Sequence, residues 1–288
     1  MKDVLAAYIK EIDYYFELLS KDYTPGLHPS LTKGGGFRIN GYQSIFDNPD
    51  FPNVDWTASA IAGSRVPLVK TVEQKSAINV ICVVDVTASM SFSGTVTKIR
   101  EIAKFVASIG FSSYRVGDRF GLVAYGDSVV SYFEPMMARS YSLEIAEWLW
   151  TFTPTASGSR GLMEALDYLP KKPSLVFWLS DFILPREAVK RFLTAAGEEY
   201  DVVPVVFWDS AEFDNIVNWG LAWLIDPETK ERRRELFTPR RREELKTAFQ
   251  ERRRELYDVF RTWNIDPIFA VDHFKPRDIA AFFLKRAG

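Results

Sequence analysis

The chain has 288 residues and a net charge of -2, with only two histidines and one cysteine. Zinc fingers, disulfide scaffolds and CxxC redox motifs are excluded, because each needs several of these scarce residues. The 36 basic and 38 acidic residues balance, so there is no general electrostatic reason to expect nucleic-acid binding. The chemistry that remains belongs to carboxylates, hydroxyls, lysines and arginines.

The sequence predicts a cytoplasmic protein without a membrane span. The longest apolar runs fall far short of the roughly 18–20 residues that a spanning helix needs. Acidic residues interrupt the apolar N-terminal stretch, so it lacks the pattern of a signal peptide. The single cysteine, Cys82, lies within an apolar run, and we expect it to be an inert core residue.

The first 75 residues predict a helix followed by an irregular β segment. Apolar residues recur at helical spacing over residues 4–19. Residues 33–75 are rich in Gly, Pro, Asn and Asp, which is typical of loops with short strands, and the best strand is at residues 66–73. We expect residues 1–75 to pack on a main domain that spans residues 76–288.

Strand and helix patterns alternate through this main domain. Runs rich in β-branched and aromatic residues predict strands at residues 78–86, 119–125, 129–133, 174–179, 202–208 and 267–271. Helical spacing lies between and after them, at residues 95–112, 143–152, 161–169, 187–196, 240–263 and 276–286. This alternation predicts an α/β fold, with a doubly wound, mostly parallel sheet of the Rossmann type and helices on both faces.

Polar side chains stand where two of these strands end. Residues 85–89 (DVTAS) end the first buried strand, and Asp181 follows the run at 174–179. In open α/β sheets, ligands bind outside the carboxyl ends of the strands. The alternate spacing lets one loop turn Asp85, Thr87 and Ser89 toward one point, and Asp181 would add a second carboxylate directly or through water. Mg²⁺ and Ca²⁺ prefer such hard oxygen ligands.

The order of the motifs resembles the DUF58 branch of the von Willebrand factor A domains. That family has a Gly-rich stretch, an Asp-Trp pair, a D-x-S-x-S metal motif, an S-D-F strand end and a D-P-E-T turn. The corresponding residues here are 34–37 (GGGF), 55–56 (DW), 85–90 (DVTASM), 180–182 (SDF) and 226–229 (DPET). The resemblance covers nearly the whole chain. It implies a von Willebrand A-like fold with a metal-ion-dependent adhesion site, where a partner's acidic side chain fills an open coordination position.

The resemblance also implies an adaptor rather than an enzyme. DUF58 proteins typically accompany MoxR-type AAA+ ATPases, and some belong to clusters that mature methanol dehydrogenase, where calcium is installed. The expected role is therefore a protein-binding adaptor or chaperone that works with a MoxR-type ATPase on a client protein. Mg²⁺ or Ca²⁺ is the expected cofactor, and neither nucleic acid nor a membrane is an expected partner.

Two positions depart from the family pattern. Thr87 replaces the first serine of the metal motif but keeps its hydroxyl. In the loop before the helix expected at residues 161–169, Arg160 stands where the family has threonine, and the neighbouring Ser159 would have to supply the missing ligand. Alternatively, the Arg160 guanidinium would lie between Asp85 and Asp181 and replace the cation. That alternative describes a structural subunit with a degenerate site.

Other hypotheses concern the neighbours of the motif. We expect Ser91, Arg160 and Phe182 to contact the partner. The alternative enzyme class is an aspartyl phosphotransferase or phosphatase that uses Asp85, but Thr87 occupies the position where such enzymes carry a second aspartate. A serine hydrolase is disfavoured because no histidine is suitably placed.

Three arginine triplets follow the last long strand, at residues 232–234, 240–242 and 252–254. Residues 230–255 hold 11 basic and 6 acidic residues. One interpretation is a solvated helix with charge pairs along its face. The other is a docking face for an acidic partner, since complementary charge would speed association.

Overall fold

The computed structural model describes residue 5 and residues 37–46, 54–63, 66–74, 77–156, 158–172, 174–213, 220–225 and 232–287. The chain forms two compact units, one of Tyr23–Ala77 and one of Met1–Asp22 with Ile78–Gly288. Leu5 is buried in the core of the larger unit. The division into residues 1–75 and a main domain of residues 76–288 stays a prediction. The rest of the helix expected at residues 4–19, the glycines at 34–36 and the turn at 226–229 lie outside the described residues.

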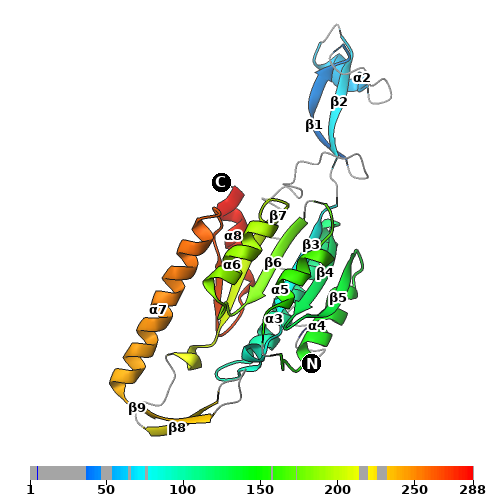
Figure 1. Cartoon of the computed structure of the whole chain (residues 1–288). Helices are drawn as coiled ribbons and strands as arrows, with labels where there is room; N and C mark the ends of the chain where they lie inside the picture. Colours follow the sequence, from blue (N-terminus) through cyan, green and yellow to red (C-terminus); the bar gives the residue numbers. More distant parts are fainter. Residues whose placement is uncertain are drawn as a thin grey trace. The chain divides into compact units, whose positions relative to one another are not determined.

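The smaller unit contains an antiparallel strand pair and a short helix (Figure 1). The strands are β1 (Phe37–Ser44) and β2 (Leu68–Gln74), and β2 confirms the strand expected at residues 66–73. The helix is α2 (Trp56–Ile61). It begins after Asp55, whose carboxylate accepts a hydrogen bond from the backbone N–H of Ala58 at 2.9 Å. An aspartate at this position stabilises a helix because it satisfies a free N–H of the first turn.

The larger unit is built on a six-stranded sheet with the order β10-β7-β6-β3-β4-β5. Its strands are β3 (Asn79–Asp85), β4 (Arg119–Tyr125), β5 (Val129–Met136), β6 (Ser174–Ser180), β7 (Tyr200–Trp208) and β10 (Ile268–Val271). Neighbouring strands run parallel except at the edge, where β5 is antiparallel to β4. The prediction of a mostly parallel α/β sheet is confirmed. Every residue of β3 and β6 is buried, as expected for strands covered on both faces.

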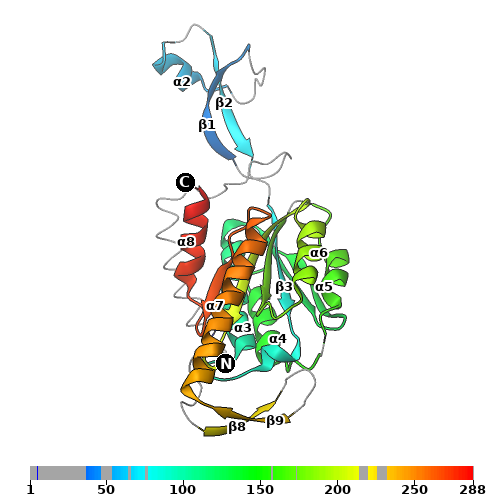
Figure 2. The same ribbon diagram turned by 60° about the vertical axis from the view of Figure 1, so that its left-hand side comes forward.

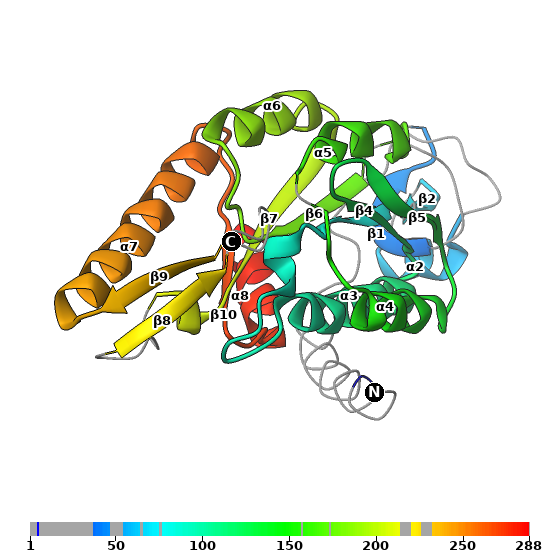
Figure 3. The ribbon, with the colours of Figure 1, turned by 60° about the horizontal axis from the view of Figure 1, so that its bottom comes forward.

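Helices cover both faces of this sheet (Figure 3). One face packs against α3 (Lys98–Val116), α4 (Tyr141–Thr151) and α8 (Pro276–Ala287). The other face packs against α5 (Gly161–Glu164), the 3-10 turn η3 (Ala165–Tyr168), α6 (Arg186–Ala196) and α7 (Pro239–Arg261). The doubly wound arrangement is therefore confirmed. Among the described residues, no helix is both long and apolar enough to cross a bilayer.

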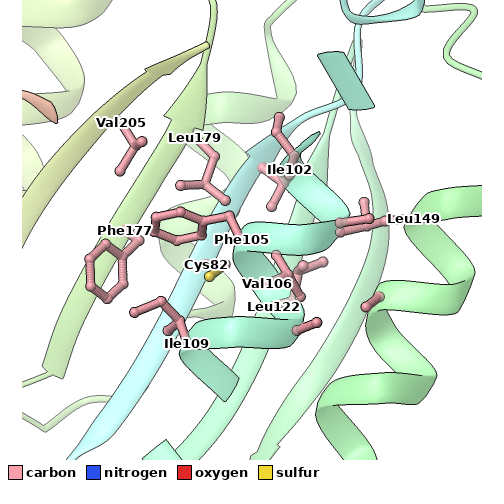
Figure 4. Packing of buried hydrophobic residues seen from close by; sticks show 14 of the residues in the cluster. Cys82, Ile102, Phe105, Val106, Ile109, Leu122, Leu149, Phe177, Leu179 and Val205 are labelled. Carbon is pink, nitrogen blue, oxygen red and sulfur yellow. The ribbon is translucent and has the colours of Figure 1, made fainter. Parts of the chain in front are cut away.

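The core between α3 and the sheet is aromatic and aliphatic (Figure 4). The Phe105 ring of α3 packs edge-on against Phe177 of β6, with ring centroids 5.3 Å apart. Cys82 of β3 is fully buried in the same cluster, and burial raises the pKa of its thiol far above the ordinary value. Cys82 is therefore a core residue with an unreactive thiol, as expected.

A hairpin that the sequence did not predict lies between β7 and α7. Its strands are β8 (Gly220–Ile225) and β9 (Arg232–Phe237), and it lies beside the start of α7 (Figure 2). The first arginine triplet belongs to β9, so the expectation that it lies on a solvated helix is wrong. The helix begins only at Pro239, because the Thr238 hydroxyl accepts the N–H of Arg241 at 3.2 Å and Pro239 suits the first helical position.

Candidate functional site

The candidate site lies where β3, β6 and β7 end. These strands are parallel neighbours, so their last residues, Asp85, Ser180 and Trp208, lie at the same edge of the sheet. A short 3-10 turn follows β3 (η2, Ala88–Ser91), and another follows β7 (η4, Ser210–Glu212). The sheet therefore brings together three loops that are far apart in the sequence.

Asp85, Thr87 and Ser89 converge as the D-x-T-x-S spacing predicted. The Asp85 side chain accepts hydrogen bonds at Oδ1 from the Thr87 N–H at 2.9 Å and the Thr87 hydroxyl at 2.7 Å. The Thr87 and Ser89 hydroxyl oxygens lie 3.1 Å apart. From the neighbouring strand, the Ser180 hydroxyl donates to Asp85 Oδ2 at 2.7 Å. One buried carboxylate thus accepts hydrogen bonds from two hydroxyl groups, and the Ser89 hydroxyl lies beside one of them.

The electrostatic environment of Asp85 favours a positive ligand. Its side chain is buried, and this burial together with the nearby Asp181 raises the pKa of Asp85 to about 6, although hydrogen bonds from Thr87 and Ser180 oppose the rise. Within the described parts of the chain, no lysine, arginine or histidine forms an ion pair with Asp85. A cation beside this carboxylate would favour its charged form and offset the cost of burial.

Asp181 has a cationic partner that sequence reasoning missed. The Lys98 ammonium lies 2.9 Å from Asp181 Oδ2 and 2.9 Å from Glu212 Oε1, and the lysine is only 1% exposed. Burial alone would lower the pKa of Lys98, but the two carboxylates outweigh it and raise that pKa. Lys98 is therefore a charged ammonium, placed here because it is the first residue of α3, which starts beside the strand ends.

The structure contradicts the alternative in which the Arg160 guanidinium replaces the cation. Its side chain is exposed at the start of α5 and does not lie between Asp85 and Asp181. The adjacent Gly161 lets this loop approach the turn before β5, since a Cβ there would come within 2.4 Å of the Ser128 backbone. The cation beside Asp181 is Lys98 and not the arginine. The exposed side chain of Arg160 is accessible to a partner, and its contact with the partner stays a prediction.

Ser159 and Ser91, two further predicted residues, have different surroundings. Ser159 is half-buried, and in the described part of the chain its hydroxyl makes no hydrogen bond to Asp85, Thr87 or Ser89. Ala156 of the same loop lies closer to the motif, since its carbonyl oxygen accepts the N–H of Ala88 at 2.8 Å. Ser91 is exposed, as a partner contact requires, and its hydroxyl donates to the carbonyl oxygen of Ala88.

The prediction that Phe182 contacts the partner is wrong. Its side chain has no exposed surface. The backbone turns at this residue with a φ of 54°, and the ring packs edge-on against Trp178 and Phe260 at centroid distances of 4.6 and 5.3 Å. The ring therefore contributes to the core and is not accessible to a partner.

Asp209 is a second site residue that sequence reasoning missed. It has no exposed surface, and its carboxylate accepts hydrogen bonds of 2.9–3.1 Å from four backbone N–H groups, those of Gly94, Thr95, Val96 and Ala211. Asp209 therefore fixes the segment that leads from the metal motif into α3. The spacing of Asp209 and Glu212 after a predicted strand is the signal that could have found it, because it forms a capping box.

These residues fit a hard divalent cation in part. A hydroxyl both donates and accepts, so Thr87 and Ser89 can turn lone pairs toward a cation held by Asp85. Mg²⁺ would complete its shell with water. Asp181 is engaged by Lys98, and Ser159 lies apart from the hydroxyl cluster, so the ligand set is smaller than the five residues expected. The described residues include no cluster of three His, Cys, Asp or Glu side chains able to hold a metal.

Comparison with known proteins gives a family and several similar folds. The family described as "Protein of unknown function DUF58" matches residues 46–255. Among solved structures, the chain is similar to BatB from Bacteroides thetaiotaomicron, with 12% identity over 73% of this chain and 98% of that one, at a TM-score of 0.42. An aerotolerance-related membrane protein from Bacteroides fragilis shows 9% identity over 73% and 97% of the two chains, also at 0.42. The von Willebrand factor type A structure from Catenulispora acidiphila shows 12% identity over 77% and 43%, at 0.36. No curated protein matches the sequence.

Proposed function

This chain belongs to the DUF58 family, and on that premise we propose that it is a protein-binding adaptor whose strand-end site takes up a divalent cation. Through this cation, the adaptor engages an acidic group of a partner protein. The observation that carries the proposal is the convergence of Asp85, Thr87 and Ser89 at the carboxyl edge of the sheet. A cation held by one carboxylate and two hydroxyls keeps positions for water or for a partner's carboxylate. Mg²⁺ or Ca²⁺ is the proposed ion.

The surroundings of Asp85 support a ligand role more than a role as phosphoryl acceptor. Both of its oxygens accept hydrogen bonds, and the side chain is buried. A nucleophilic carboxylate has to reach the phosphorus atom, whereas a ligand has only to face the cation. Hydrolysis of a generic phosphate ester that is lost in Asp85→Asn would instead establish the enzyme alternative.

The proposed partners are a MoxR-type AAA+ ATPase and the client protein on which the two act in the cytoplasm. The resemblance of the motif order to DUF58 proteins supports this choice. The proposed process is maturation or assembly of the client, including insertion of a metal into an enzyme such as methanol dehydrogenase.

Biolayer interferometry with the MoxR-type ATPase of the same organism tests this function. We expect wild-type protein to bind the immobilised ATPase in Mg²⁺, and the affinity to fall about tenfold or more in EDTA or in Asp85→Asn, because the bridging cation is lost. Asp167→Asn is the matched control, since Asp167 is an exposed carboxylate away from the site. Equal binding by wild type and Asp85→Asn, with and without EDTA, would contradict the proposal.

A further inference from the structure

The strand-end site contains a fixed positive charge of its own. Lys98 is buried, and its ammonium contacts Asp181 and Glu212, each at 2.9 Å. A lysine is almost never buried without charged partners, because an unpaired ammonium loses its hydration. Asp181 is thereby committed to Lys98, while Asp85 accepts hydrogen bonds only from hydroxyl and backbone groups.

The position of Lys98 is set by a network and not by its own side chain alone. Glu212 contacts Lys98 through Oε1 and accepts the N–H of Asp209 through Oε2 at 3.2 Å. Asp209 in turn accepts the N–H groups of Gly94 and Val96, just before α3 begins. The ammonium and the loop of the metal motif are therefore fixed by the same turn after β7.

The net charge of the strand-end site depends on the presence of Lys98. Asp85, Asp181 and Glu212 with Lys98 carry a net charge of -2 when all are ionised, and a divalent cation would bring the site to neutrality. Without the lysine the same carboxylates would carry -3, and the loaded site would stay negative. Like charges repel strongly in a buried, low-dielectric setting. A negative site would therefore hold the cation more tightly but repel an acidic partner group.

We propose that Lys98 is the positioning residue of this site: it keeps Asp181 off the cation and neutralises the loaded site, so that a coordination position stays open for an acidic partner group. This inference rests on the proposed function. It assigns Lys98 the task of balancing cation affinity against carboxylate binding.

Mn²⁺ titrations followed by water-proton relaxation test the assignment, because the relaxation reports both bound Mn²⁺ and the water left on it. In Lys98→Met, we expect Mn²⁺ to bind about tenfold more tightly and to carry less water, since Asp181 Oδ2 becomes free to ligate it, while Oδ1 keeps its hydrogen bond from the Ile183 N–H. Added acetate, a probe for the partner's carboxylate, should displace water from Mn²⁺ on the wild type but no longer on this variant. Lys104→Met is the control, because Lys104 also pairs with a glutamate of α3 but lies outside the cluster.

A second variant separates charge from folding. Lys98→Met combined with Glu212→Gln restores the cluster charge of -2 and removes one unpaired buried carboxylate. We expect its Mn²⁺ affinity to return toward that of the wild type, while Mn²⁺ still carries less water because Asp181 is free. Circular dichroism melting shows which variants are folded, and this double variant decides the test if Lys98→Met alone does not fold.

The possible outcomes separate a failure of the role of Lys98 from a failure of the proposed function. Absence of Mn²⁺ binding by the wild type would overturn the proposed function. Mn²⁺ binding with the same affinity, water content and acetate response in wild type and Lys98→Met would overturn the role of Lys98 alone. That role would also be overturned if the folded double variant leaves as much water on Mn²⁺ as the wild type does.

Discussion

Asp209 illustrates how far the strand-end site depends on a side chain that reaches no ligand. Its carboxylate holds four backbone N–H groups, three of which belong to the segment after the metal motif. These hydrogen bonds are part-buried, and hydrogen bonds to charged groups are among the stronger ones, so losing the acceptor is costly. The segment after the motif is therefore held by a residue that follows a different strand, β7.

Replacing Asp209 with alanine should destabilise the fold. We expect the free energy of unfolding to fall by about 3 kcal/mol, because the N–H groups that it satisfies lose a charged acceptor. Urea denaturation at pH 7 measures the change. Glu198→Ala, at an exposed turn position, should stay within about 0.5 kcal/mol of the wild type. Similar stabilities for both variants would show that Asp209 does not hold the loop.

Asp209 should also make stability depend on pH. Burial alone would raise the pKa of Asp209, but the N–H groups of Ala211, Val96, Thr95 and Gly94 outweigh it and lower that pKa. The folded-state pKa of Asp209 lies below the unfolded value of about 4. Ionised Asp209 therefore stabilises the fold fully above about pH 4, and this stabilisation is lost as the pH falls from there through the folded-state pKa.

Urea denaturation at pH 7 and pH 3 measures this dependence. Between these values, wild type should lose more stability than Asp209→Asn, which cannot titrate at this position. An equal loss in both proteins would contradict a lowered pKa of Asp209.

The residues of the site differ in how far the sequence revealed them. The convergence of Asp85, Thr87 and Ser89 follows from local spacing within one loop, so it could be predicted. The pairing of Lys98 with Asp181 depends on where α3 starts relative to β6, and no local pattern encodes that distance. Arg160 was the alternative internal cation because of its position in the family motif, whereas the lysine that pairs with Asp181 stands at the start of another helix, α3.

Helix α7 connects the third arginine triplet to the site. The Arg252 guanidinium donates hydrogen bonds to the carbonyl oxygens of Phe182 and Leu184, both at 2.8 Å. Arg253 lies over the Phe269 ring, 4.5 Å from its centroid. This triplet is thus partly structural, so neither a purely solvated helix nor a pure docking face describes it. Arg252 holds the loop that continues from Asp181.

Removing the Arg252 side chain should loosen this loop. We expect Arg252→Ala to lower the free energy of unfolding by about 2 kcal/mol, because two part-buried carbonyl groups lose a charged donor. Arg254→Ala, at an exposed position one residue beyond Arg253, should change it by less than about 0.5 kcal/mol. Thermal melting of both variants measures the difference. Equal melting temperatures would contradict the role of Arg252 in holding this loop.

Elements of the larger unit were predictable to different degrees. Strands β3, β6 and β7 are buried along most of their length, so their apolar, β-branched composition was enough to predict them as strands. The pair β8 and β9 was missed because arginine and glutamate favour helix, and β9 consists largely of these residues. Its strand form depends on pairing with β8, a tertiary contact that outweighs local propensity.

For the molecule as a whole, the candidate site is a property of the larger unit. Asp85, Lys98, Asp181 and Asp209 all belong to Ile78–Gly288. In the described parts of the smaller unit, no residue takes part in the hydrogen bonds of this cluster. We therefore expect cation binding to require the larger unit and its network of buried carboxylates.

Isothermal titration calorimetry with Mg²⁺ measures directly whether the strand-end site binds a divalent cation. We expect one Mg²⁺ per chain for wild type and for the Asp167→Asn control, and an affinity lower by about tenfold or more in Asp85→Asn, because the one directly available carboxylate is lost. Binding of equal strength in Asp85→Asn and wild type, or no binding by the wild type, would contradict this expectation.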